Sequence, residues 1–207
     1  MQNIRFLIYK NKFQIGDFML SKIIKNIALI LEDNQTLNNL SALEEDSGVV
    51  VENSTQTYIS LVNFVIANVA ENFLCYNCTQ DLVSDNSGKL CLADLRYNPC
   101  LIRHVKDENF KNVKFNISVD YLHVNNPNKV YYVDYAFVPS ELTSITDTVM
   151  LPIGLDYKTL CYGVVSEYYA LKLQFAEANI WEQKFKQGLR NLNRTYKEIR
   201  FASRRWL

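Results

Sequence analysis

The C-terminal part of this chain, from Leu151 onward, constrains the fold most, because its apolar residues follow a helical period almost without interruption. A stripe on one helix face needs apolar residues every three or four positions. That spacing is met by Ala178, Trp181, Phe185, Leu189, Leu192, Tyr196 and Ile199. A similar stripe precedes it over residues 157–175. A compact domain buries two such stripes by turning the chain back, so we expect a helix hairpin with its turn near residues 172–176.

Charge is distributed unevenly along the chain. The 207 residues carry a formal net charge of zero, which argues against a general nucleic-acid binder. Residues 186–207 nevertheless contain seven basic residues and one acidic residue, and residues 44–46 form an acidic cluster. No apolar run approaches the roughly 20 residues that a membrane span needs, and the N-terminus does not resemble a signal peptide. We therefore expect no membrane association.

The N-terminal half is expected to supply two further helices. Residues 21–31 place Ile23, Ile24 and Ile27 on one side of a short helix. Ser54 or Thr55 suits the N-cap of a second helix that ends near Phe73. The intervening residues 34–52 are mostly polar and acidic, which predicts a loop or linker. Residues 4–9 are weakly strand-like.

Between the helix pairs the apolar period becomes that of β-strands. Alternating apolar and polar residues over 115–121 predict a half-buried strand. A turn at residues 125–128 separates it from another strand over 130–138. Short strands are also expected at 90–97 and 100–105.

These elements predict an α+β fold that is mainly α. We expect one domain over residues 1–207, with a helical core at 19–75 and 150–200. An antiparallel β insertion should occupy about 88–140, and an extended basic tail should occupy 197–207.

Four of the five cysteines lie close enough in sequence to be tested as a metal site. Cys75 and Cys78 form a C-x2-C pair, and Cys91 and Cys100 follow. Four thiolates could hold zinc, but the second pair lacks the tight spacing of a zinc ribbon. Because cysteine is often simply a small buried apolar residue, we expect no metal.

No sequence motif for catalysis is recognisable. The two histidines, His104 and His123, form no ligand or base pattern, and phosphate-binding and nucleophile motifs are absent. The three adjacent carboxylates at residues 44–46 are expected to be solvated. We therefore expect a protein that is not an enzyme and that holds no cofactor.

The basic C-terminal residues have more than one interpretation. They could form a solvated helix face, contact DNA phosphates without reading sequence, or dock onto a partner protein. Arginine and tryptophan dominate interface energies, which favours docking. The candidate docking residues are Arg190, Arg194, Lys197, Arg200, Phe201, Arg204, Arg205 and Trp206.

The stretch 131–192 resembles the head-to-tail adaptor, or connector, proteins of tailed bacteriophages, of the podovirus or crAss-like type. The matching elements are the Tyr-rich strand ending at Pro139, the link 142–148 and the Leu-Pro-Ile of 151–153. The helix with G-x-x-x-E-Y at 163–168 and the helix with F-x-x-A-x-x-W at 175–181 follow. The cysteines and residues 34–53 lie outside this pattern.

This resemblance implies a structural virion protein that forms a ring, commonly of twelve copies, beneath the portal at the head–tail junction. Its partners would be the portal protein, neighbouring copies, and tail or ring proteins below. The ring would line the DNA channel and touch DNA only non-specifically, and the basic tail would reach the portal. The alternatives are a zinc-binding nucleic-acid or regulatory module and a non-enzymatic helical scaffold.

Overall fold

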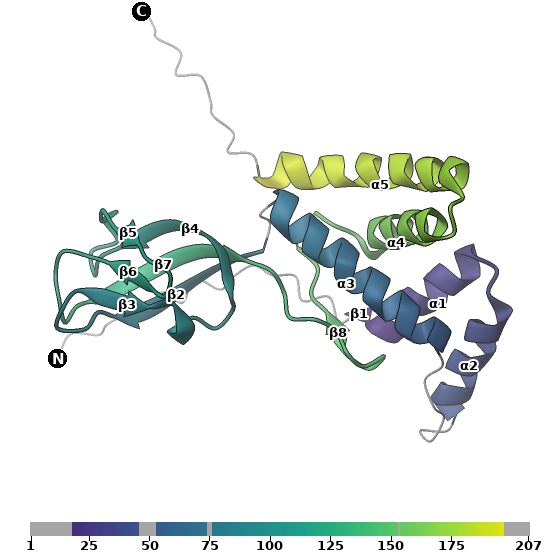
Figure 1. Ribbon diagram of the computed structural model, residues 1–207, viewed down its shortest axis with the longest axis horizontal. Helices are drawn as coiled ribbons and strands as arrows, with labels where there is room; N and C mark the ends of the chain where they lie inside the picture. Colours follow the sequence, from purple (N-terminus) through teal and green to yellow (C-terminus); the bar gives the residue numbers. More distant parts are fainter. Residues whose placement is uncertain (1–17, 46–52, 74–75, 153, 197–207) are drawn as a thin grey trace, which may run out of the picture. The chain divides into compact units, whose positions relative to one another are not determined.

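The computed structural model describes residues 18–45, 53–73, 76–152 and 154–196. Within these ranges the chain is α+β and mainly α, as predicted, and its small sheets are antiparallel (Figure 1). The chain divides into two compact units. Of the described residues, the helical unit comprises those within 18–65 and 142–196, and the β unit comprises those within 66–141.

The helical unit contains most of the predicted helices. Its helices are α1 (Leu20–Ile30), α2 (Asn34–Glu45), the first part of α3 (Asn53–Phe73), α4 (Tyr157–Leu171) and α5 (Phe175–Tyr196). The short strands β1 (Phe18–Met19) and β8 (Thr148–Val149) pair beside them. The predicted stripe on α1 is confirmed, because Ile23, Ile24 and Ile27 are fully buried.

The predicted helix hairpin is confirmed. Helices α4 and α5 lie side by side and antiparallel (Figure 1), and the break falls at residues 172–174. On α5, Ala178 and Leu189 are buried, while Trp181 and Phe185 are half-buried. The stripe therefore faces α4 along the part of α5 whose side chains the structure describes.

The loop predicted at residues 34–52 is wrong over its first part, which forms α2. The helix is polar, so its apolar period is weak, and a cap at its start helps to define it. Asp33 Oδ1 accepts a hydrogen bond from Thr36 N at 3.1 Å, as an N-cap residue does. Asp33 Oδ2 accepts from Thr36 Oγ1 at 2.6 Å and from Tyr58 Oη of α3 at 2.8 Å. Asp33 thus joins α2 to α3.

We expect Asp33→Asn to lower the free energy of unfolding by about 1 kcal/mol at neutral pH, because asparagine still caps α2 but the hydrogen bonds from Thr36 and Tyr58 lose their charged acceptor. Burial alone would raise the pKa of Asp33, but hydrogen bonds from Thr36 and Tyr58 outweigh it and lower the pKa from 3.8. The charged form therefore stabilises the fold above pH 3.8, and that contribution is lost as pH falls through the folded-state pKa. Urea titrations across pH measure the free energy of unfolding of both proteins, and the two values should become equal in acid. A difference between them that does not change with pH would contradict this account.

The β unit contains two three-stranded sheets. One has the order β2 (Asn77–Val83), β7 (Val130–Phe137), β4 (Pro99–Lys106), and the other has the order β3 (Lys89–Cys91), β6 (Tyr121–His123), β5 (Asn116–Ile117). The strands predicted at 100–105 and 130–138 are confirmed as β4 and β7. The strand predicted at 90–97 is shorter, because a 3-10 turn follows β3 at Leu92–Asp94.

The β region begins earlier than the predicted boundary near residue 88. Strand β2 pairs with β7 along its whole length, from Asn77 opposite Ala136 to Val83 opposite Val130. Cys78 and Leu82 are buried on β2, and Tyr131, Val133 and Tyr135 are buried on β7. Polar Gln80 lies between Cys78 and Leu82, where alternation requires an apolar residue, so this segment lacks a clear strand period.

The single half-buried strand predicted at 115–121 is wrong. Asn116 and Ile117 form β5, Tyr121 begins β6, and residues 118–120 form a tight turn between them, in which Ser118 N donates to the carbonyl of Tyr121 at 2.8 Å. Val119 at this turn is 93% exposed, and Ile117 is also exposed. In the paired strands β5 and β6 the buried apolar residue is Leu122 of β6, which lies opposite the fully buried Leu90 of β3.

The weak strand predicted at residues 4–9 lies outside the described residues.

Candidate functional site

The stem of the α4–α5 hairpin is tightly packed because small residues lie where the helices approach. A Cβ atom on Gly163 would lie 2.9 Å from Val65 Cγ1 and 3.0 Å from Phe185 Cε2. A Cβ on Gly188 would lie 2.3 Å from Thr159 Oγ1. These spacings are shorter than carbon contacts allow, so larger residues at either glycine would push the helices apart.

A side-chain hydrogen bond fixes the register of the two helices. Ser166 Oγ on α4 donates to the carbonyl of Ala178 on α5 at 2.9 Å, and both residues are buried. Tyr162 and Trp181 then meet one turn further along, with ring centroids 5.6 Å apart. The hairpin is therefore a defined unit and not two loosely associated helices.

The tip of the hairpin is apolar and exposed. We call this surface the hairpin tip, and it consists of Leu171, Leu173 and Phe175. Leu173 is 74% exposed, Leu171 is 65% exposed and Phe175 is 61% exposed. Single exposed apolar residues are ordinary, but a cluster of this kind marks an interaction surface.

The backbone at the hairpin tip is also strained. Leu173 has a φ of 59°, in the left-handed region that usually takes glycine. Its N–H donates to Ala170 at 3.0 Å, and the N–H of Gln174 donates to Tyr169 at 2.9 Å, which together close α4 in a Schellman motif. The chain thus holds an exposed leucine in a position that a glycine would occupy at lower cost.

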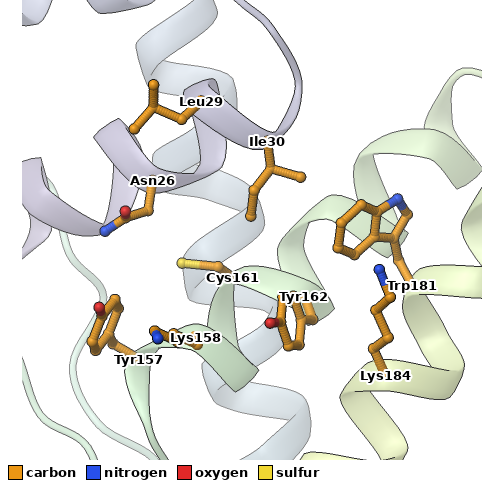
Figure 2. Close-up of a pocket in the computed structure, with 9 residues that line it drawn as sticks. All are labelled: Asn26, Leu29, Ile30, Tyr157, Lys158, Cys161, Tyr162, Trp181 and Lys184. Carbon is orange, nitrogen blue, oxygen red and sulfur yellow. The ribbon is translucent and has the colours of Figure 1, made fainter.

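A cavity of about 400 Å³ opens between α1, α4 and α5 (Figure 2). We call it the aromatic–lysine pocket. Helix α1 contributes Asn26, Leu29 and Ile30, and α5 contributes Trp181 and Lys184. The residues that α4 contributes are Tyr157, Lys158, Cys161 and Tyr162. All nine come from the helical unit, and none of them is a carboxylate or a histidine.

The charge in this pocket is positive. Lys184 Nζ lies 3.8 Å from the centroid of the Trp181 ring and 5.9 Å from that of Tyr162 (Figure 2). Lys158 lies in the first turn of α4, where the helix dipole adds positive potential. The nearby Asp156 is engaged as the N-cap of α4, accepting from Thr159 N at 2.6 Å. The pocket therefore suits a partner that is both apolar and anionic.

The thiol in this pocket is unsuited to chemistry. Cys161 is buried, and its Sγ lies 3.8 Å from the carbonyl oxygen of Ile23, to which it donates. Burial, with a smaller effect of the Asp156 charge, raises the pKa of the thiol to about 12. A thiol with this pKa is not a nucleophile at neutral pH.

Most of the predicted docking residues lie outside the described part of the chain. Arg190 is exposed on α5, and Arg194 belongs to α5, although its side chain is outside the description. Lys197, Arg200, Phe201, Arg204, Arg205 and Trp206 lie outside it entirely. Their docking role stays a prediction.

The candidate zinc ligands are distributed over three strands. Cys78 is buried on β2, Cys91 is half-buried on β3, and Cys100 is exposed on β4. In the part of the chain that the structure describes, no three His, Cys, Asp or Glu side chains are grouped so that they could hold a metal ion. Cys75 falls outside that part.

Sequence reasoning missed the aromatic–lysine pocket and the hairpin tip. One local signal was available: Trp181 and Lys184 are three residues apart and so share a helix face. No such signal exists for the pocket residues of α1, because they lie more than a hundred positions earlier in the sequence.

No protein-family model matches this chain, and no curated protein sequence matches it. None of the described helices is both long enough and apolar enough to cross a lipid bilayer.

Proposed function

We propose that this chain is a structural virion protein, a ring-forming head-to-tail adaptor of a tailed phage. Copies of it, commonly twelve, would assemble beneath the portal, line the DNA channel and bind tail proteins below. The observation that carries the proposal is the α4–α5 hairpin, whose stem is tightly packed and whose tip is apolar and exposed. This hairpin coincides with the helices on which the resemblance to adaptors rests.

The hairpin tip supports assembly because exposed apolar surface is stabilised when another protein covers it. Full burial of an exposed leucine or phenylalanine side chain contributes about 1.5–3 kcal/mol. Leu171, Leu173 and Phe175 together therefore supply a favourable term for contact with a neighbouring copy. The strain at Leu173 supports the same role, since strained positions are retained where they serve a contact.

The charge distribution supports a channel that surrounds DNA without holding it. A formal net charge of zero avoids the strong attraction to phosphates that a basic lumen would have. The excess of basic residues is confined to the C-terminal end of the sequence. In the proposal this end docks on acidic groups of the portal.

The test is the mass of the chain in solution, alone and mixed with portal rings purified from the same phage. Mass photometry should show a monomer alone and a portal carrying a full set of copies in the mixture. A chain that stays monomeric beside the portal would overturn the proposal.

Leu173→Gly should have opposite effects on stability and assembly. Glycine adopts the φ of 59° without strain, so the free energy of unfolding should rise by about 1 kcal/mol. Assembly on portal rings should weaken, because the most exposed leucine of the hairpin tip is lost. Thermal melts measure the change in stability, and the mass measurement reports the change in assembly.

Glu32→Gly is the matched control. Glu32 occupies the equivalent position after α1, with a φ of 55° and the same Schellman hydrogen bonds, but its side chain is polar. Glu32→Gly should raise the free energy of unfolding about as much as Leu173→Gly does, and it should leave assembly unchanged. If both variants assemble like the wild type, the hairpin tip is not an assembly surface.

A further inference from the structure

We propose that the aromatic–lysine pocket receives the acidic segment of residues 44–52 from a neighbouring copy of this chain. This inference rests on the proposed function, since it names one contact by which copies join in a ring. A ring built from identical copies needs two different surfaces on each copy, complementary to one another. The pocket is one such surface, and the acidic segment is the other.

The pocket sets the chemistry of its occupant. Lys158 and Lys184 supply two cations, and no carboxylate is among the residues that line the cavity. Leu29, which is 56% exposed, and Trp181 supply apolar surface. The occupant must therefore bring carboxylates together with small apolar side chains.

The chain itself contains a segment with that composition. Residues 44–52 read Glu-Glu-Asp-Ser-Gly-Val-Val-Val-Glu, and three consecutive carboxylates occur nowhere else in the sequence. The valines that follow match the apolar wall of the pocket. The negative and positive surfaces of one copy are thus complementary to those of the next.

The position at which α2 ends favours a neighbour over the same copy. Glu44 and Glu45 belong to the last turn of α2, about 15 Å along the helix axis from Asn34. Figure 1 shows α2 leading from the end of α1 away from α4 and α5, which carry the rest of the pocket. The C-terminal end of α2, after which the acidic segment continues, is therefore held away from the pocket of its own copy.

The first experiment is a titration with a synthetic peptide of residues 42–53. The chain has two tryptophans, Trp181 and Trp206, so the Trp206→Phe variant reports on the pocket alone. The peptide should change Trp181 emission saturably, and the double variant Lys158→Glu/Lys184→Glu should weaken binding about ten-fold or more. Lys172→Glu/Lys186→Glu changes net charge equally outside the pocket and should bind normally. The inference is wrong if the peptide does not bind, or if it binds the Lys158→Glu/Lys184→Glu variant as tightly as the parent chain.

The second experiment separates a neighbour from the same copy. Pocket reversal (Lys158→Glu/Lys184→Glu) and segment reversal (Glu44→Lys/Glu45→Lys/Asp46→Lys) should each prevent assembly on portal rings, because like charges then meet at every interface. An equimolar mixture should assemble, since each reversed surface meets an opposite one in an alternating ring. If the mixture fails as each variant alone does, the segment does not bind across copies and the inference is wrong.

The two experiments also separate this inference from the proposed function. If the wild-type chain forms rings and the peptide does not bind, the assignment of the pocket is wrong and the proposed function is not contradicted. If the peptide binds as described and the wild-type chain never forms rings, the ring function is wrong, and the pocket still binds the acidic segment.

Discussion

A chain that ends at Ile199 is expected to keep its fold and to lose binding to portal rings. The removed residues contain Arg200, Arg204, Arg205 and Trp206, which are the residue types that contribute most to interfaces. Truncating an arginine or tryptophan at the centre of an interface typically costs about 2 kcal/mol or more, so removing all four should abolish binding. Co-sedimentation with portal rings measures the loss, and circular dichroism checks the fold.

A tail with the same eight residues in shuffled order is the control for this deletion. It keeps the charge and changes the spacing of Phe201 and Trp206 relative to the arginines. Binding by the shuffled tail would assign the contact to charge alone. A truncated chain that binds portal rings as well as the full chain does would show that the tail has no docking role.

Gly163→Val is expected to destabilise the helical unit by about 1–3 kcal/mol, as overpacking of a core does. Its Cβ would lie 2.9 Å from Val65 Cγ1 on α3 and 3.0 Å from Phe185 on α5, so α4 could not keep its distance from both helices. For a chain of this size the melting temperature should fall by roughly 2–4 °C per kcal/mol. Calorimetry or urea titration gives the value.

The companion substitution Val65→Ala tests whether the cause is this contact. It removes the closest methyl group, so the double variant Gly163→Val/Val65→Ala should be less unstable than the two single effects added together. If the two single effects on the free energy of unfolding simply add, the effect of Gly163→Val has another cause, for example a change in the helical propensity of α4.

The helix hairpin could be predicted from the sequence because its packing is local and periodic. The break at 172–174 followed from the need to bury two stripes, and the structure gives the turn its Schellman hydrogen bonds around Leu173. The structure also explains the small residues that carry the resemblance. Gly163 lies against Val65 and Phe185, and Ala178 is buried beside the hydrogen bond that its backbone carbonyl accepts from Ser166.

Elements that depend on distant partners were not predictable in the same way. Helix α2 has a weak apolar period, and the hydrogen bonds that Asp33 makes to Thr36 and Tyr58 hold it. The alternation at 115–121 suggested one strand, because a periodic pattern does not reveal that the chain reverses at Val119. The aromatic–lysine pocket likewise exists only where three separate helices meet.

Electron microscopy of the full chain mixed with portal rings tests the central claim most directly. The account predicts a closed ring of copies stacked beneath the portal, in which every hairpin tip is covered by a neighbouring copy. Bare portals beside free, monomeric chains would contradict it.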